Sequence, residues 1–302
     1  TILNKNKRSQ RLSVKEYRFK DSGIVLVNKP KGISSNKVVN IVKFKLGAKK
    51  CGHLGTLDLE GEGLLPVTIN NATKLFDFYL QKDKTYETEF VFGFETDTLD
   101  TSGKIVKECE VNFSDNELKM AVNSMIGKYM QMPPLYSAKK VNGQVGYKLA
   151  RVGETINLSP KEVEIYEFKI LKKINNRTFR FEITCSSGTY IRSVCRDLAY
   201  KLGTYGSMQC ILRTRCGVFC IKDAYLLEDI EKGNFEIIPC QNLFDYDIIN
   251  LSENDFFKLK NGQQLIIDFK DAFYKIYFNN QFLGVGEVRE KNLKMKIRLA
   301  DF

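Results

Sequence analysis

The sequence predicts an α+β fold made of one large domain and a small C-terminal β domain. Between Gly23 and about residue 240, segments with the two-residue period of strands are interrupted unevenly by segments of helical period. Such uneven order is typical of an α+β sheet and not of a regular parallel one. From residue 246 short strand-like segments dominate, and 302 residues are enough for both units.

The N-terminal part is predicted to contain a basic arm, a buried strand and a helix. Residues 1–20 are polar and basic with little periodicity, so we expect a mobile arm. The apolar run from Gly23 to Lys29 stops at Pro30-Lys31-Gly32. Candidate helix caps and an apolar helix face follow before Gly47: the caps are Ser34, Ser35 and Asn36, and the face is Val38, Val39, Val42 and Leu46.

Two half-buried strands and two more helices are predicted in the rest of the large domain, residues 21–245. Apolar and polar residues alternate over residues 86–92 and 179–185, as in strands with one buried face. Ser114-Asp115-Asn116-Glu117 has the pattern of a capping box before an apolar helix face. A further helical pattern runs from Ile191 to Gly203.

The small domain, residues 246–302, is predicted to combine one helix with short strands. Residues 251–260 have helical spacing, and Asn261-Gly262 has the composition of a turn. Strand-like segments follow near residues 265–267, 273–278, 282–288 and 293–299.

Composition restricts the classes of function. Forty-seven Lys and Arg against 36 Asp and Glu give a net charge of +11, which favours polyanionic partners but is also met in proteins with solvated surface charge. The single histidine excludes a multi-histidine metal site, so we expect no metal. The eight cysteines form no Cys-x-x-Cys pair, and we expect reduced thiols. No apolar run approaches the roughly 20 residues of a membrane helix, so we expect a cytoplasmic protein.

The segment Gly52-His53-Leu54-Gly55-Thr56-Leu57-Asp58 is where we expect chemistry. It places the only histidine five residues before an aspartate in a glycine-hinged loop. Any Ser-His-Asp or Cys-His arrangement would have to use His53, and the remaining candidate is a carboxylate that acts as nucleophile or base. Read alone, the segment is more typical of an ordinary turn in which glycine supplies a positive φ.

The strand and turn of residues 23–32 before this loop, and four motifs after it, change that interpretation. In chain order the four motifs are Gly61-Glu62-Gly63-Leu64-Leu65-Pro66-Val67, Asn71-Ala72-Thr73-Lys74-Leu75, Lys84-Thr85-Tyr86-Glu87 and Gly188-Thr189-Tyr190-Ile191-Arg192-Ser193. With the loop, this ordered set resembles the TruB family of pseudouridine synthases from about Gly23 to about Phe219. The resemblance implies the pseudouridine synthase fold, a mixed and largely antiparallel sheet with flanking helices.

The chain departs from the family pattern at the loop itself. Family members commonly have Gly-His-Thr-Gly-Thr-Leu-Asp-Pro and then Ala-Thr-Gly, whereas this chain has Leu54, Leu59 and Glu60-Gly61-Glu62-Gly63. Without the proline a fixed φ angle is lost, so we expect a less rigid loop. The two added carboxylates would lie near a phosphate-binding surface.

The resemblance implies that the enzyme converts a uridine in the T loop of tRNA, at position 55, to pseudouridine without a cofactor. Asp58 matches the catalytic aspartate, and Arg192 matches its buried cationic partner. Tyr86 matches the tyrosine that stacks on the base and is placed to remove the C5 proton. Covalent attack by Asp58 and removal of the 2′ proton by Asp58 stay open as alternatives.

Further residues are implied to bind the substrate. They are His53, Tyr190, Leu212, Lys29, Lys31, Lys74, Lys139 and Lys140. Tyr190 would line the base pocket, Leu212 would pack beneath the base or belong to the core, and His53 would insert where the flipped nucleotide leaves its stack. The lysines would contact phosphates. Lys139 and Lys140 fall in an insertion of about residues 131–155, a thumb over the RNA or else a solvated loop.

Three functions stay open. The first is the tRNA-modifying isomerase, acting as a monomer on the T stem-loop of tRNA. The second is a noncatalytic tRNA-binding or folding role on the same scaffold, which the matches at Asp58, Tyr86 and Arg192 disfavour as the sole role. The third is a related synthase that acts on ribosomal RNA or a guide-directed substrate. Residues 246–302 resemble a PUA-type RNA-binding domain, with a structural cap as the alternative.

Overall fold

The main body of the protein is one mixed sheet. The computed structural model describes residues 21–80, 82–135, 140–141, 144–145 and 158–301. Within these ranges, eleven strands join in the order β14-β1-β3-β12-β4-β11-β10-β7, with β13 on β12, β15 on β1 and β2 on β3. The pairs β1–β14 and β3–β12 are parallel and the others antiparallel. The predicted mixed, largely antiparallel sheet of an α+β fold is confirmed.

The strands of this sheet are β1 (Gly23–Lys29), β2 (Cys51–His53), β3 (Glu62–Ile69), β4 (Lys84–Phe92), β7 (Gly127–Gln131), β10 (Lys161–Lys173), β11 (Thr178–Cys185), β12 (Gly206–Cys216), β13 (Phe219–Cys220), β14 (Tyr225–Leu226) and β15 (Ile238–Pro239). The short pairs are β5 (Phe94–Thr96) with β6 (Ile105–Glu108), and β8 (Lys140–Val141) with β9 (Gln144–Val145). The helices here are α1 (Ser35–Leu46), η1 (Asn70–Leu75), α2 (Phe76–Leu80), α3 (Asp115–Asn123), α5 (Ile191–Lys201), η2 (Ile221–Asp223), α6 (Leu227–Lys232) and η3 (Cys240–Leu243).

The predicted capping residues begin and end the helices as expected. Ser34 caps α1 by accepting from the amide of Lys37 at 3.2 Å, and Gly47 ends it at φ 62°, a left-handed conformation that glycine adopts without strain. Ser114 and Glu117 form the predicted capping box of α3.

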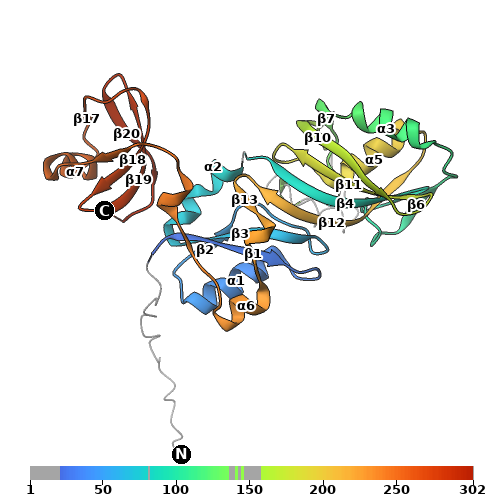
Figure 1. The fold of residues 1–302 in the computed structure, drawn as a ribbon, viewed down its shortest axis with the longest axis horizontal. Helices are drawn as coiled ribbons and strands as arrows, with labels where there is room; N and C mark the ends of the chain where they lie inside the picture. Colours follow the sequence, from blue (N-terminus) through green and yellow to red (C-terminus); the bar gives the residue numbers. More distant parts are fainter. Residues whose placement is uncertain (1–20, 81, 136–139, 142–143, 146–157, 302) are drawn as a thin grey trace, which may run out of the picture.

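Two groups of helices cover the sheet. The helices α3 and α5 pack with β4, β10 and β11 around a phenylalanine-rich core, at the end of the molecule away from the C-terminal domain (Figure 1). The helices α1 and α6 pack against β1 and β3. The central strands β3, β12 and β4 therefore lie between two close-packed cores, one under α3 and α5 and one under α1 and α6. The loop from β2 to β3 leads directly into this central part of the sheet.

The C-terminal part has its own sheet and core. Five described strands, β16 (Ile248–Asn250), β17 (Leu265–Ile266), β18 (Ala272–Phe278), β19 (Gln281–Arg289) and β20 (Asn292–Arg298), pair in the order β16-β18-β19-β20-β17 beside α7 (Glu253–Lys260). The four predicted strands are present, while β16 was not predicted, and α7 begins two residues late because Ser252 caps it. Val285 and Leu299 pack into a cluster with Ile24 and Phe244, so this sheet docks on the large one (Figure 1).

Several sequence predictions fall on residues that the structure does not describe. These are the basic arm of residues 1–20, Lys139 and most of the proposed thumb. In the described part of the chain, no helix is long and apolar enough to cross a membrane.

Candidate active site

A cavity of about 560 Å³ lies where the β2–β3 loop, β4, β12 and the start of α5 meet. Its walls contain all three predicted catalytic residues, which come from segments far apart in the chain. The lining residues are Gly55, Thr56, Leu57, Asp58, Lys84, Tyr86, Pro133, Lys161, Ser187, Gly188, Thr189, Tyr190, Ile191, Arg192, Met208, Ile211 and Arg213.

Asp58 and Arg192 form an ion pair at this cavity. Arg192 Nη2 lies 2.9 Å from Asp58 Oδ2, with 9% of the Arg192 side chain and 55% of the Asp58 side chain exposed. The cation is thus buried and the carboxylate reaches solvent.

The Arg192 guanidinium is oriented from its other side. Its Nη1 donates to the Thr98 carbonyl at 2.9 Å and lies 3.5 Å from the Asp100 carboxylate. Asp100 is itself fixed, since its Oδ1 accepts from the Thr98 hydroxyl at 2.9 Å and from the Ser102 amide at 3.1 Å. These contacts leave Nη2 pointing at Asp58. The sequence analysis did not identify Asp100, which lies in a loop outside every quoted motif.

The loop that carries Asp58 is braced by α1 and β1. The Ser35 hydroxyl donates to the Leu57 carbonyl at 2.9 Å and accepts from the Leu57 amide at 3.0 Å. The Leu59 carbonyl accepts from the Gly32 amide at 2.9 Å and from Lys29 Nζ at 3.3 Å. The backbone on both sides of Asp58 is therefore held despite the missing proline.

The prediction that Lys29 contacts phosphate is wrong. Its side chain is completely buried, and its ammonium donates to the carbonyls of Pro30 and Leu59. Burial lowers the pKa of Lys29, while the carboxylates of Glu62, Asp58 and Glu60 raise it. Lys29 therefore supports the loop and is not available to an RNA backbone.

Arg213 is the largest buried side chain near the site, and the sequence analysis missed it. It is 1% exposed, and its guanidinium donates to the carbonyls of Leu64 at 2.8 Å, Gly55 at 3.0 Å and Thr56 at 3.4 Å. The guanidinium thus ties the loop to β3. Its only sequence signal is that it is a charged residue inside a largely apolar strand, and such a residue more often faces solvent.

Tyr86 forms part of the cavity wall beside Arg213, its neighbour on the adjacent strand. The two residues are paired in the register of β4 and β12, so their side chains share one face of the sheet. Tyr86 is half-buried, and burial raises the pKa of its phenol, whereas the positive charge of the nearby Arg213 guanidinium lowers that pKa. Because burial is the larger effect, the neutral phenol is the form present at neutral pH.

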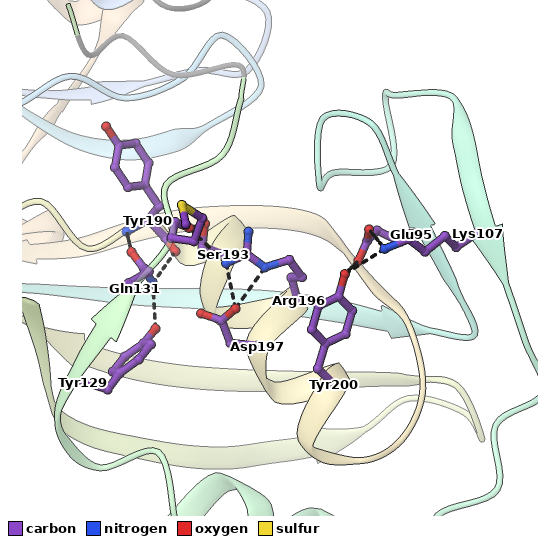
Figure 2. A network of polar contacts seen from close by, with 10 residues as sticks. Glu95, Lys107, Tyr129, Gln131, Tyr190, Ser193, Arg196, Asp197 and Tyr200 are labelled. Atoms are coloured by element: carbon purple, nitrogen blue, oxygen red, sulfur yellow. Dashed lines mark hydrogen bonds and ion pairs between the residues drawn. The ribbon is translucent and has the colours of Figure 1, made fainter. Parts of the chain in front are cut away.

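Tyr190 lines the cavity as predicted, but Leu212 does not. Figure 2 shows the Tyr190 ring pointing away from the polar contacts that hold its backbone. On β12 the cavity is lined by Met208, Ile211 and Arg213. Leu212 pairs with Glu87 and points to the other face of the sheet, since neighbouring strand residues face opposite sides. On this strand Ile211, and not the predicted Leu212, lines the cavity.

Comparisons with known proteins place this chain. Residues 43–191 match the model of the TruB family pseudouridylate synthase N-terminal domain, and residues 248–296 match that of the pseudouridine synthase II TruB C-terminal domain. A tRNA pseudouridine synthase B from Caldanaerobacter subterraneus subsp. tengcongensis is 37% identical over 278 residues, covering 91% of this chain and 98% of that protein. One from Aquifex aeolicus is 36% identical over 274 residues, covering 88% and 96%.

The chain belongs to the TruB family. Its fold is also that of solved relatives at lower identity. The archaeal box H/ACA sRNP Nop10-Cbf5 complex gives a TM-score of 0.65 at 19% identity, covering 92% of this chain and 86% of that one. An H/ACA RNP bound to a substrate RNA containing 2′-deoxyuridine gives a TM-score of 0.65 at 18% identity, covering 92% and 85%. These likenesses support the fold.

The remaining described residues that the TruB resemblance implied do not line this cavity. His53 is in β2, its Nδ1 accepts from the Gly55 amide at 3.3 Å, and burial lowers its pKa. Lys31 forms an ion pair with the added carboxylate of Glu60 at 3.3 Å, with both side chains about half exposed. Lys74 is exposed in η1, and Lys140 is in β8.

One further basic residue was missed. Lys84, two residues before Tyr86, is 5% exposed and lines the cavity, and burial lowers its pKa. Among the described residues of this TruB-family chain, no group of three or more His, Cys, Asp or Glu could hold a metal ion.

Proposed function

We propose that this enzyme converts the uridine at position 55, in the T loop of tRNA, to pseudouridine, with Asp58 as the catalytic carboxylate. One observation carries the proposal: the Asp58 carboxylate, held by Arg192 at 2.9 Å, borders a cavity walled by the Tyr86 ring. The names of the curated relatives support the choice of tRNA as substrate. The exposed carboxylate favours catalysis over a purely RNA-binding role.

The reaction requires the uridine to leave its stack and enter the cavity. Extraction of a base costs a few kcal/mol, which contacts between the protein and the flipped nucleotide offset. The bond between N1 and C1′ then breaks, the uracil turns, and C5 bonds to C1′ while C5 loses its proton and N1 gains one. Asp58 either attacks the substrate covalently or takes the 2′ proton of the sugar.

The neighbours of Asp58 have separate roles in this proposal. Arg192 keeps the carboxylate aligned, so that its other oxygen faces the nucleotide. The Tyr86 ring stacks on the uracil while the base turns. The Tyr86 oxygen receives the C5 proton as the phenol passes its own proton to solvent, and the Arg213 guanidinium stabilises the negative charge that develops on that oxygen.

RNA contacts outside the cavity belong to the same proposal. Exposed Lys31 and Lys74 contact phosphates, as do Lys139 and Lys140 of the proposed thumb, and His53 inserts into the gap left by the flipped base. We propose residues 21–245 as the catalytic domain and residues 246–302 as a PUA-like domain that binds RNA. The enzyme acts as a cytoplasmic monomer on the T stem-loop.

Tritium release tests this function. A tRNA transcript labelled at C5 of its uridines is compared with a matched transcript that has cytidine in place of the uridine at position 55. The proposal predicts release of one tritium per molecule from the first transcript and none from the second. Equal release from both would contradict position 55, and no release from either would favour the noncatalytic role.

A further inference from the structure

Gln131, the last residue of β7, holds the first residues of α5 in place through its side-chain amide. It is 1% exposed, its Oε1 accepts from the Tyr190 amide at 2.8 Å, and its Nε2 donates to the Tyr190 carbonyl at 3.2 Å (Figure 2). Tyr190 is the N-cap residue of α5, and its own side chain makes no capping bond. Gln131, which belongs to a neighbouring strand, therefore provides the hydrogen-bond acceptor for the N-cap amide that a capping side chain provides within a helix.

Two hydrogen bonds fix which way the Gln131 amide faces. The Tyr190 backbone N–H can only donate, so the atom that it contacts at 2.8 Å is Oε1. Nε2 then faces the Tyr129 hydroxyl oxygen and donates to it at 2.7 Å. Burial and the nearby Asp197 carboxylate raise the pKa of the Tyr129 phenol, so Tyr129 keeps its proton.

The next residue repeats this attachment to α5. The Met132 carbonyl accepts from the Ser193 hydroxyl and from Arg196 Nη2, both at 2.9 Å. The chain that leaves β7 is thus tied to the first two turns of α5 by its side chain and by its backbone. Asp197, Tyr129 and Gln131 are absent from the cavity walls, whereas Tyr190 and Arg192 line them.

We propose that Gln131 is a positioning residue for the isomerisation, because it sets the start of α5 from which Tyr190 faces the base and Arg192 reaches Asp58. The inference rests on the function proposed above. Arg192 lies two residues beyond the Tyr190 backbone that Gln131 holds, so a displacement there moves the guanidinium from its 2.9 Å contact with Asp58. A misplacement of about 1 Å lowers a rate by about 10²-fold.

The test compares four variants in single-turnover reactions with the tRNA transcript. Gln131→Leu removes every bond of the amide, Gln131→Glu keeps only the acceptor for the Tyr190 amide, and Tyr129→Phe removes the hydroxyl that orients Gln131. Tyr200→Phe is the matched control, since that hydroxyl bonds to Glu95 and Lys107 near the far end of the same helix (Figure 2). Binding of tRNA and amide hydrogen exchange in the free protein are measured alongside.

We expect Gln131→Leu to lower the single-turnover rate about 10²-fold with tRNA affinity unchanged. Gln131→Glu should recover part of that rate, and Tyr200→Phe should react like the parent. Exchange at residues 190–194 should become about tenfold faster in Gln131→Leu, the effect of one lost net hydrogen bond. If Gln131→Leu does not fold, Tyr129→Phe should show the same two effects, a lower single-turnover rate and faster exchange at residues 190–194, but each of smaller magnitude.

Three results would overturn the proposal: a parent-like rate in Gln131→Leu, a rate loss no larger than in Tyr200→Phe, or unchanged exchange at residues 190–194. Failure of the proposed function gives a different result. The parent itself would then release no tritium, and the exchange measurement, which needs no substrate, would still decide whether Gln131 holds the start of α5.

Discussion

Arg192 is buried and Asp58 is exposed, yet the guanidinium and the carboxylate lie 2.9 Å apart. This difference in burial means that the two side chains enter the proposed reaction differently prepared. The cation is fixed by the Thr98 carbonyl and Asp100, so it does not have to be ordered when RNA binds. The carboxylate remains exposed at the edge of the cavity. In the proposed reaction the bound nucleotide covers it, so desolvation of Asp58 accompanies RNA binding.

Tyr86→Phe should separate stacking from proton transfer. The ring is kept, so stacking worth about 1–3 kcal/mol should survive and tRNA affinity should change little. The hydroxyl that exchanges the proton with C5 is lost, so the rate of pseudouridine formation should fall by at least about 10²-fold. Single-turnover reactions followed by nucleoside chromatography measure this. Product formation at the parent rate would mean that Tyr86 only stacks.

Arg213→Met should destabilise the protein more than Arg215→Met. The Arg213 guanidinium is buried and donates to three backbone carbonyls, and an unsatisfied buried acceptor costs about 1–3 kcal/mol. We expect the free energy of unfolding to fall by at least about 3 kcal/mol. Arg215, a third exposed and paired with Asp83, is the matched control on the same strand. Urea unfolding that gives equal losses would contradict the bracing role of Arg213.

Ile211→Ala and Leu212→Ala should have different effects, because only Ile211 lines the cavity. Loss of the Ile211 side chain should weaken support of the base and lower the single-turnover rate by about tenfold. Leu212→Ala should leave that rate close to the parent's while lowering the unfolding midpoint. The reverse order of rates would restore Leu212 as the residue beneath the base.

His53 should titrate below the ordinary histidine pKa of 6.5, because burial and Arg213 both disfavour its cation. The unfolded chain then takes up a proton before the folded one, so stability is lost as pH falls below about 6.5. The single histidine gives one imidazole signal, so NMR titration reads its pKa directly. A value above 6.5 would refute the expectation. His53→Gln should reduce the loss of stability between pH 7.5 and 6.

The sequence predicted the elements and residues whose signals are local. Strand alternation, the Ser34 cap and the Ser114 capping box depend on neighbouring residues, and all are present. Asp58, Arg192 and Tyr86 were identified because each stands in a recognisable family motif, in the case of Asp58 despite the departures at Leu54 and Leu59, and the fold brings all three to one cavity. The strand β16 was missed because three residues are too few to show the two-residue alternation of a strand, and because its partner β18 is distant in the chain.

The predictions for Lys29 and Leu212 were wrong because burial and strand facing depend on packing, which the sequence alone does not show. The sequence contains no sign that Lys29 is buried, because its carbonyl acceptors belong to a turn and to a loop 30 residues away. Leu212 was implied by the family resemblance, with a core role as the alternative. The register of β12 against β4 is irregular between Met208 and Cys210 and between Arg213 and Arg215, so strand alternation in the sequence does not show which of these residues face the cavity.

The central claim is that the Asp58 carboxylate performs the chemistry. Asp58→Asn keeps the size of the side chain and removes its charge, so the nucleotide should still bind while no nucleophile or base remains. The most direct measurement is single-turnover tritium release from the C5-labelled tRNA transcript with saturating Asp58→Asn protein. We predict no release above background at parent-like tRNA affinity. Release at a rate near the parent's would show that another group carries out the reaction.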